Sequence, residues 1–88
     1  MKPQERTDAI LRSPLDPLDR LLLVAVAARL GANPTTWAKP EDFAERTGMG
    51  LSTVKDRLAA LTSAGVLVRE QREHRAKDTW IDWEVLAA

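Results

Sequence analysis

Basic side chains are concentrated in one part of this 88-residue chain, the stretch from Leu51 to Lys77. This stretch holds six lysines and arginines against three acidic residues, a net charge of +3, whereas the whole chain holds 13 of each sign and is neutral. The remaining residues therefore carry −3, so the chain is an electric dipole. Long cationic side chains suit contacts with phosphate groups. The candidates for such contacts are Arg57, Arg69, Arg72, His74, Arg75 and Lys77.

Catalytic chemistry finds little support among the residue types present. The chain has no cysteine, which excludes thiol catalysis, disulfides and zinc fingers of the cysteine type. His74 is the only histidine and lacks the partners that a metal site needs. A phosphate-binding glycine loop and an H-E-x-x-H motif are both absent from the sequence, and Ser52 and Ser63 have no base beside them. We therefore expect a protein that is not an enzyme and needs no metal or cofactor.

The basic stretch begins inside a pair of short helical patterns that spans residues 43–65. Residues 48–50, Gly-Met-Gly, separate the two patterns. The second pattern places Val54, Leu58 and Leu61 at the i, i+4, i+7 spacing of one apolar stripe. A connection of three residues is too short for two such helices to lie side by side, so they must cross at a steep angle. This arrangement is typical of a helix-turn-helix.

A longer helix is predicted over residues 18–30. Asp16 can cap its N-terminus, and Pro17 fits the first helical position, where no amide hydrogen is needed. Apolar residues occur on nearly every side of this helix. The charged exceptions are Asp19, Arg20 and Arg29. Because a helix that is apolar all round is normally buried, we expect it at the centre of the domain.

Residues 1–14 are expected to form an N-terminal arm with one or two loose helical turns. Ile10 and Leu11 supply its apolar content, and Pro14 and Pro17 end any helix that forms. With so little to bury, the arm is either frayed or docked, for example on a second copy of the chain. The sequence thus divides into this arm and one domain over residues 15–88.

The hydrophobic period changes from 3.6 to 2 after Gly65. Residues 66–70 form one predicted strand, and residues 80–86, in which apolar and polar side chains alternate, form a second. The polar residues 71–79 connect them as the loop of a hairpin. Residues 35–37 are β-favouring and predict a short edge strand.

Three tryptophans need placing in this scheme. Trp83 shares the alternation of Ile81 and Val85, so we expect it in the core. Trp37 is expected to pack on the edge of the sheet. Trp80 lies on the opposite face of its strand and is the tryptophan expected to be exposed.

The predicted order is helix, short strand, helix, helix, strand, loop and strand. In this order the chain from about residue 15 to residue 86 resembles the winged helix-turn-helix domains of bacterial, phage and plasmid regulators and replication-associated proteins. The resembling residues are Trp37, E-R-T-G-M at 45–49, T-V at 53–54, Leu58, Leu61 and A-G-V-L-V-R at 64–69. The resemblance implies a mainly α fold with a small β-sheet (α+β): three core helices and a β-hairpin wing, with room for an extra N-terminal helix.

The resemblance also implies that Leu51–Ala64 is a recognition helix that enters the major groove of double-stranded DNA, with the hairpin loop along the backbone. With Val54 and Leu58 toward the core, a helical wheel places small polar side chains on the opposite face and its flanks. Such side chains can hydrogen-bond to base edges, and a methyl group can meet a thymine methyl. The candidates for base contacts are Ser52, Thr53, Lys55, Asp56 and Ala59.

Two residues depart from the family pattern. The Asp56 carboxylate can accept from cytosine but repels phosphates. Gly50 stands where a capping serine or threonine is usual. These departures, with the zero net charge, keep a second hypothesis open: a winged helix that serves as a protein-interaction adaptor in a replication or transcription complex.

A DNA-binding chain of this kind is expected to be a small transcriptional or mobile-element regulator. Because one module makes few contacts, we expect it to act as a homodimer or cooperatively. Candidate dimer contacts are the arm, Leu15 and Trp80. The longest apolar run, residues 21–28, is too short to span a bilayer, and residues 1–12 lack a signal-peptide core, so we expect a cytoplasmic, nucleoid-associated protein.

Overall fold

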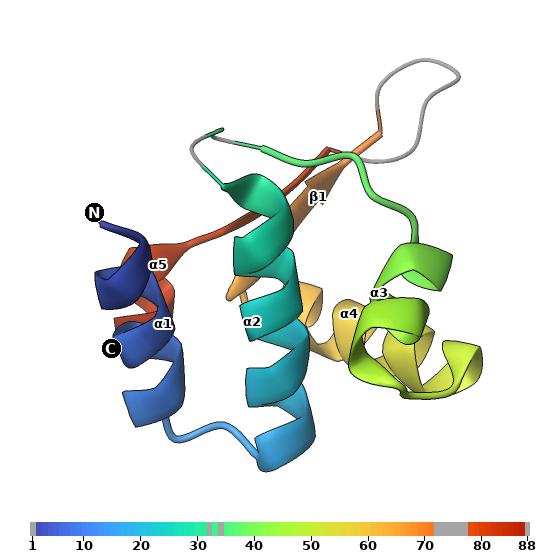
Figure 1. Cartoon of the computed structure of the whole chain (residues 1–88), viewed down its shortest axis with the longest axis horizontal. Coiled ribbons are helices and arrows are strands. Elements are labelled where there is room, and N and C mark those ends of the chain that lie inside the picture. Colours follow the sequence, from blue (N-terminus) through green and yellow to red (C-terminus); the bar gives the residue numbers. More distant parts are fainter. Residues whose placement is uncertain (1, 32, 34, 72–77, 88) are drawn as a thin grey trace.

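The computed structural model of the chain describes residues 2–31, 33, 35–71 and 78–87. Within these residues the fold is mainly helical, with one small antiparallel sheet of two strands (Figure 1), which confirms the expected α+β class. The helices are α1 Pro3–Arg12, α2 Pro17–Leu30, α3 Pro40–Thr47, α4 Leu51–Ser63 and α5 Trp83–Ala87, and the strands are β1 Leu67–Glu70 and β2 Asp78–Ile81. Within this part of the chain, no helix is long and apolar enough to cross a membrane.

The start of α2 follows the signals in the sequence. Asp16 caps the helix, since its Oδ1 accepts a hydrogen bond of 3.0 Å from the backbone N–H of Asp19, and Pro17 occupies the first helical position. The buried side of α2 includes Leu22, Leu23 and Val26, all with no exposed surface. The helix packs against α1, α3, α4 and β2, so it supplies the centre of the core as expected.

The connection from α3 to α4 depends on one glycine conformation. Gly48 has φ +77°, in the left-handed region, and its N–H donates to Ala44 O to close α3. The N–H of Met49 then donates to Oγ1 of Thr47 at 3.2 Å, and α4 begins two residues later, at Leu51. Phe43 of α3 and the apolar stripe of α4 are buried in the same core. This turn therefore fixes which side of α4 faces the solvent.

The N-terminal segment is more ordered than its composition indicates. Instead of one or two loose turns, α1 is a helix of ten residues that packs against α2 and α5. Ile10 is fully buried, whereas Leu11 is 54% exposed. The helix ends at Arg12, ahead of the two prolines, and Ser13 N–H donates to Ile10 O. One buried isoleucine docks this segment on the chain's own domain.

The two strands pair with Leu67 opposite Ile81 and Arg69 opposite Thr79. An isolated bridge adds Thr36 on the other side of β2, where the backbone groups of Thr36 and Thr79 exchange hydrogen bonds of 2.9 and 2.6 Å. The expected edge strand at residues 35–37 is thus reduced to one bridging residue. Thr79 is fully buried between its two neighbours.

The second strand is shorter than predicted, and the prediction of a strand over residues 80–86 is wrong in its second half. The strand ends at Ile81, and α5 begins at Trp83. The Oδ1 atom of Asp82 accepts hydrogen bonds from the N–H groups of Glu84 and Val85, at 3.1 and 3.2 Å. This cap starts a helix in which Leu86, rather than Val85, is buried.

The tryptophans follow the sequence expectations only in part. Trp83 is half-buried against the core, although it lies on α5 and not on a strand. Trp80, expected to be exposed, is also half-buried there. The side chain of Trp37 is 65% exposed, so the expectation that it packs on the sheet edge is wrong. Only its neighbour Thr36 joins the sheet.

Candidate nucleic-acid interface

One side of α4 is free of contact with the core and carries all five candidate base-contact residues. The opposite side is anchored by Val54, Leu58 and Leu61, which are between 0 and 3% exposed. Because these three share one stripe, the side chains between them point away from the domain. The exposed residues on that outward side are Ser52, Thr53, Lys55, Asp56, Ala59, Thr62 and Ser63.

The N-terminus of α4 presents backbone rather than side-chain groups. Gly50 is the cap residue and makes no side-chain hydrogen bond, and the first turn contains no acidic residue. The first backbone N–H groups of a helix have no partner within the helix and carry a partial positive charge. Ser52 and Thr53 add hydroxyl groups in this same turn. The beginning of α4 can therefore donate several hydrogen bonds to an anion or a base edge.

A shallow hollow of about 310 Å³ lies where α4 meets β1. Lys55, Ala59 and Thr62 line it from the helix, and Arg69 lines it from the strand. The hollow therefore brings two cationic side chains, 14 positions apart in the sequence, to the edge of the outward side of α4. Ala59 between them leaves room for a group that both cations can contact.

Arg69 is held in place at the base of the hairpin. Its Nε donates to Oγ1 of Thr79, the residue directly opposite on β2, at 3.3 Å. Arg69 is half-buried, and this burial lowers the pKa of its guanidinium below the usual value, because the charged form loses water contacts. A partly desolvated cation interacts more strongly with an approaching phosphate than a fully hydrated one.

Arg57 is directed to a different place from Lys55, the other cationic residue of α4. Its Nη1 lies 2.9 Å from both carboxylate oxygens of Asp16 and 3.0 Å from Oδ1 of Asp19, at the start of α2. These hydrogen bonds raise the pKa of Arg57, with the bond to Asp16 as the largest cause. In Asp16 the pKa is lowered, first by the bond from Asp19 N–H and then by Arg57. Arg57 was expected to contact phosphate, whereas in this fold its head group joins α4 to α2.

The remaining backbone-contact candidates are on the hairpin loop. Arg72, His74, Arg75 and Lys77 lie outside the described residues, so Arg69 is the hairpin candidate whose position is defined. Sequence reasoning assigned Arg69 to the hairpin but did not pair it with Lys55 and Thr62. The register that sets Arg69 opposite Thr79 was the missing information, since it turns the Arg69 side chain toward α4.

The arrangement presents groups that can bind an anion or a polar surface. Among the described residues, no group of three or more His, Cys, Asp or Glu side chains could hold a metal ion. The hydroxyl of Thr62 donates to Leu58 O at 2.6 Å, as is common for a threonine within a helix. The chemistry of this surface is therefore hydrogen bonding and charge attraction.

Comparisons of this chain with protein-family models, with curated proteins and with solved structures find no match. The function is therefore inferred from the residues that the fold brings together.

Proposed function

We propose that this protein is a winged helix-turn-helix protein that binds double-stranded DNA as a small transcriptional or mobile-element regulator. The observation that carries the proposal is the uncovered outward side of α4, with Lys55 and Arg69 at its edge. In this proposal α4 enters the major groove and the β1–β2 hairpin follows the backbone. No catalytic step is assigned to the protein.

The dimensions of α4 agree with this role. A helix of 13 residues is about 20 Å long, and the major groove of B-DNA admits one α-helix at a width of about 12 Å. Ser52, Thr53, Lys55, Asp56 and Ala59 then face the base edges, while the hollow with Arg69 faces a phosphate. Lys55 belongs to both regions and can contact either a guanine or the backbone.

The order of the elements supports the winged helix-turn-helix assignment. A three-residue turn with a left-handed Gly48 joins α3 to α4, and a two-stranded hairpin follows α4. The Thr36 bridge adds a short third chain segment to this hairpin, at the place where the β-favouring residues 35–37 predict an edge strand. The loop that would form the tip of the wing carries four of the backbone-contact candidates, three of them lysine or arginine and one histidine.

The proposal is tested by selecting genomic DNA fragments with the purified protein and titrating a recovered site with salt. If about five phosphates are neutralised, log K should fall with log salt at a slope of about −4 to −5. A recovered inverted repeat would also give the symmetry of the complex. Failure to enrich any fragment, or a slope near zero, would remove the proposal.

A second candidate function is a protein-interaction adaptor in a replication or transcription complex. It is favoured by the capture of Arg57, which leaves the outward side of α4 with one lysine and one exposed aspartate, Asp56. The variant Asp56→Ala separates the two functions. A DNA-binding protein should change its affinity and sequence preference, whereas an adaptor should lose its protein partner and show no retarded DNA band.

A further inference from the structure

The outward side of α2 is apolar along its length and is left uncovered by the fold. On a helical wheel, Leu21, Val24 and Ala28 lie in one row that faces away from the buried side, with Leu18 beside it. Leu18 and Leu21 are 41 and 42% exposed, and Ala28 is exposed as well. In Figure 1 no described element lies in front of α2. The helix was expected at the centre of the domain, and this is the side of it that the described residues leave uncovered.

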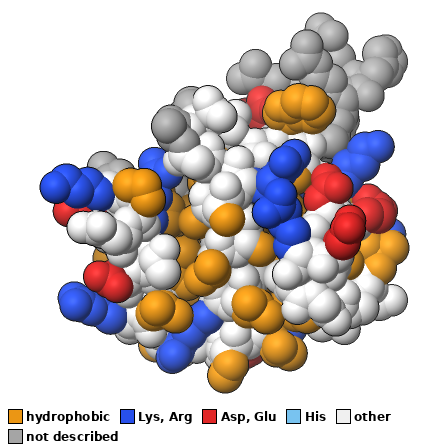
Figure 2. All heavy atoms as spheres, viewed as in Figure 1, with side chains coloured by type: hydrophobic (Ala, Val, Ile, Leu, Met, Phe, Trp, Pro, Cys, Tyr) orange, Lys and Arg blue, Asp and Glu red, His pale blue; other side chains and the backbone are white. Residues whose placement is uncertain are grey.

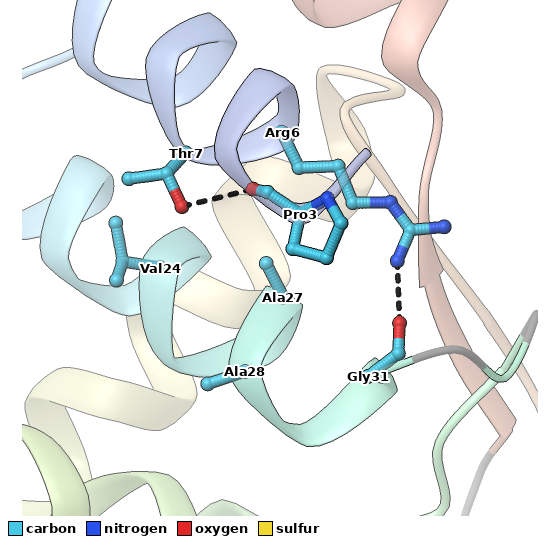
Figure 3. A pocket seen from close by; sticks show the side chains of 7 residues that line it. All are labelled: Pro3, Arg6, Thr7, Val24, Ala27, Ala28 and Gly31. Carbon is cyan, nitrogen blue, oxygen red and sulfur yellow. Dashed lines mark hydrogen bonds between the residues drawn. The ribbon is translucent and has the colours of Figure 1, made fainter. Parts of the chain in front are cut away.

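Helix α1 extends this surface on one flank. A groove of about 230 Å³ separates the two helices, with Pro3, Thr7 and Val24 among the residues that line it (Figure 3). Arg6 closes its end by donating from Nη1 to Gly31 O at 2.6 Å. Leu11 follows Thr7 by one turn on the same side of α1 and is 54% exposed. We call the combined surface of Leu11, Leu18, Leu21, Val24 and Ala28 the α2 stripe.

We propose that a second copy of this chain covers the α2 stripe, so that the protein forms a two-fold symmetric dimer through α2. A two-fold interface requires a surface that is complementary to itself. An apolar helix side without any charge in its central row meets this requirement, because no like charges are brought together at its centre. Two helices that meet in this way commonly cross at about 50°.

The charges beside the stripe indicate why a second copy fits. A stable dimer buries about 1,200 Å² or more in total, so the flanks of the stripe must lie in the interface with the leucines. The α1 flank carries Arg12 and Arg20 and also the exposed Asp8, one turn before Arg12, so its excess of positive charge is a single charge. The α3 flank carries three acids and two arginines, and so an excess of negative charge. These residues are Glu41, Asp42, Glu45, Arg29 and Arg46.

An inclined crossing lays the α1 flank of each copy over the α3 flank of the other. Arg12 and Arg20 then approach Glu41 and Glu45 of the partner subunit. Figure 2 shows hydrophobic side chains along the middle of this face, with Lys and Arg side chains at the lower left and acidic side chains at the right over α3. Some side chains of the opposite sign lie among each group.

A nucleic acid is a poor occupant of this surface. The central row of the stripe offers no hydrogen-bond donor on its side chains, and the acids of α3 repel phosphates. The surface is also made from α1, α2 and α3 residues that are separate from the outward side of α4. The dimer proposal therefore does not depend on the DNA-binding proposal.

Sedimentation of the full chain between about 1 and 300 μM tests the dimer directly. The wild type should show concentration-dependent association to a dimer. Leu21→Asp should raise the dissociation constant by about tenfold or more, because two charges would be buried in one interface. Leu51→Asp is the matched control, since Leu51 is 38% exposed at the start of α4, and it should associate like the wild type. A wild type that stays monomeric over this range, or a Leu21→Asp variant that associates normally, overturns the proposal.

Engineered cysteines give a second readout that does not depend on a destabilising change. The chain has no cysteine of its own, so each variant carries a single thiol. Leu21→Cys, Val24→Cys and Ala28→Cys place that thiol along the stripe, and Leu51→Cys is again the control. Under mild oxidation at least one of the three should form a disulfide-linked dimer faster than the control, because residues near a two-fold axis meet their own copies. Equal rates at all four positions would contradict a dimer through α2.

Discussion

The Nη1 atom of Arg57 lies 2.9 Å from Oδ2 of Asp16, which caps the start of α2 and is 41 residues earlier in the chain. The same Nη1 reaches Asp19 at 3.0 Å. This cation therefore fastens the middle of α4 to the first turn of the central helix. Arg57 is therefore not available for contacts on the outward side of α4. Its ion pairs instead hold α4 in a fixed orientation relative to α2.

The Asp16–Arg57 ion pair should make the stability of the fold depend on acid pH. The pKa of Asp16 is lowered in the folded chain from an ordinary value of 3.8. A lowered folded pKa contributes stability that is present above the unfolded pKa and is lost as pH falls from there through the folded pKa. Melting temperatures between pH 7 and pH 3 should therefore drop below about pH 4. The drop should be smaller in Arg57→Gln than in the wild type.

Arg29→Gln is the control for this experiment, because Arg29 is an exposed arginine at the other end of α2. Its melting temperature should follow the wild-type pH curve. An identical acid profile in Arg57→Gln and the wild type would mean that the pair contributes nothing in solution, as is common for partly exposed pairs.

Substitution of the glycine in the α3–α4 turn should cost stability through the backbone alone. Gly48 has φ +77°, and a Cβ built there meets no atom within 4 Å, so Gly48→Ala introduces no clash. Its cost should be about 1 kcal/mol of unfolding free energy, because an alanine is strained in the left-handed region. Urea denaturation followed by circular dichroism measures this change.

Gly50 provides a matched comparison in the same turn. It has φ −64° and equally open space around a Cβ, so Gly50→Ala introduces neither a clash nor left-handed strain. Alanine is a poorer N-cap than glycine by about 0.5 kcal/mol, and it restricts the unfolded chain by a similar amount, so the net change in unfolding free energy should be about a few tenths of a kcal/mol. Equal losses in the two variants would show that Gly48 does not hold its left-handed conformation.

Removal of the Asp82 cap should loosen α5. The carboxylate accepts from the N–H groups of Glu84 and Val85, and its loss in Asp82→Ala should reduce stability by about 1 kcal/mol. Amide hydrogen exchange should accelerate at residues 83–87 before it does so in α2. Glu84→Ala, two residues after Asp82 and at an exposed position, should leave exchange in α5 nearly unchanged. Slow exchange retained at Val85 and Leu86 in Asp82→Ala would disprove the role of this cap.

Lys55 should contribute to DNA binding through charge. Because it lines the hollow with Arg69, Lys55→Ala should weaken binding about threefold to tenfold on all sequences and make the salt slope shallower by about one. Lys2→Ala removes an exposed lysine next to α1 and should leave both quantities unchanged. A Lys55 effect confined to one base position would instead assign Lys55 to base readout.

The central and paired helices could be predicted from local signals in the sequence. Asp16, Pro17 and Gly48 mark helix ends by chemistry that acts within a few residues, and the Val54, Leu58 and Leu61 stripe defines which side of α4 is buried. The exposed positions of the five base-contact candidates follow from that stripe alone. These signals are strong because each is decided inside a single turn or helix.

The two ends of the fold could not be predicted in the same way. The alternation over residues 80–86 fits a strand, but Trp83 and Leu86 also lie three positions apart, as on one side of a helix, and the Asp82 cap decides between the two. Helix α1 packs against α5. Because residues 83–86 were predicted as part of a strand, nothing in the sequence indicated this partner for the N-terminal helix. The ion pair of Arg57 joins residues that are 41 positions apart, so no local sequence pattern predicts it.

The bridge between Thr36 and Thr79 protects one edge of the hairpin from pairing with another chain. An unpaired strand edge is a template on which a foreign chain can add a strand and start an aggregate. At Thr79 both backbone groups are already engaged by Thr36, while β1 occupies the opposite side. A foreign strand could pair with Thr79 only after it had displaced the segment that contains Thr36. Within the described hairpin, the edge that remains open to strand addition is therefore the outer edge of β1.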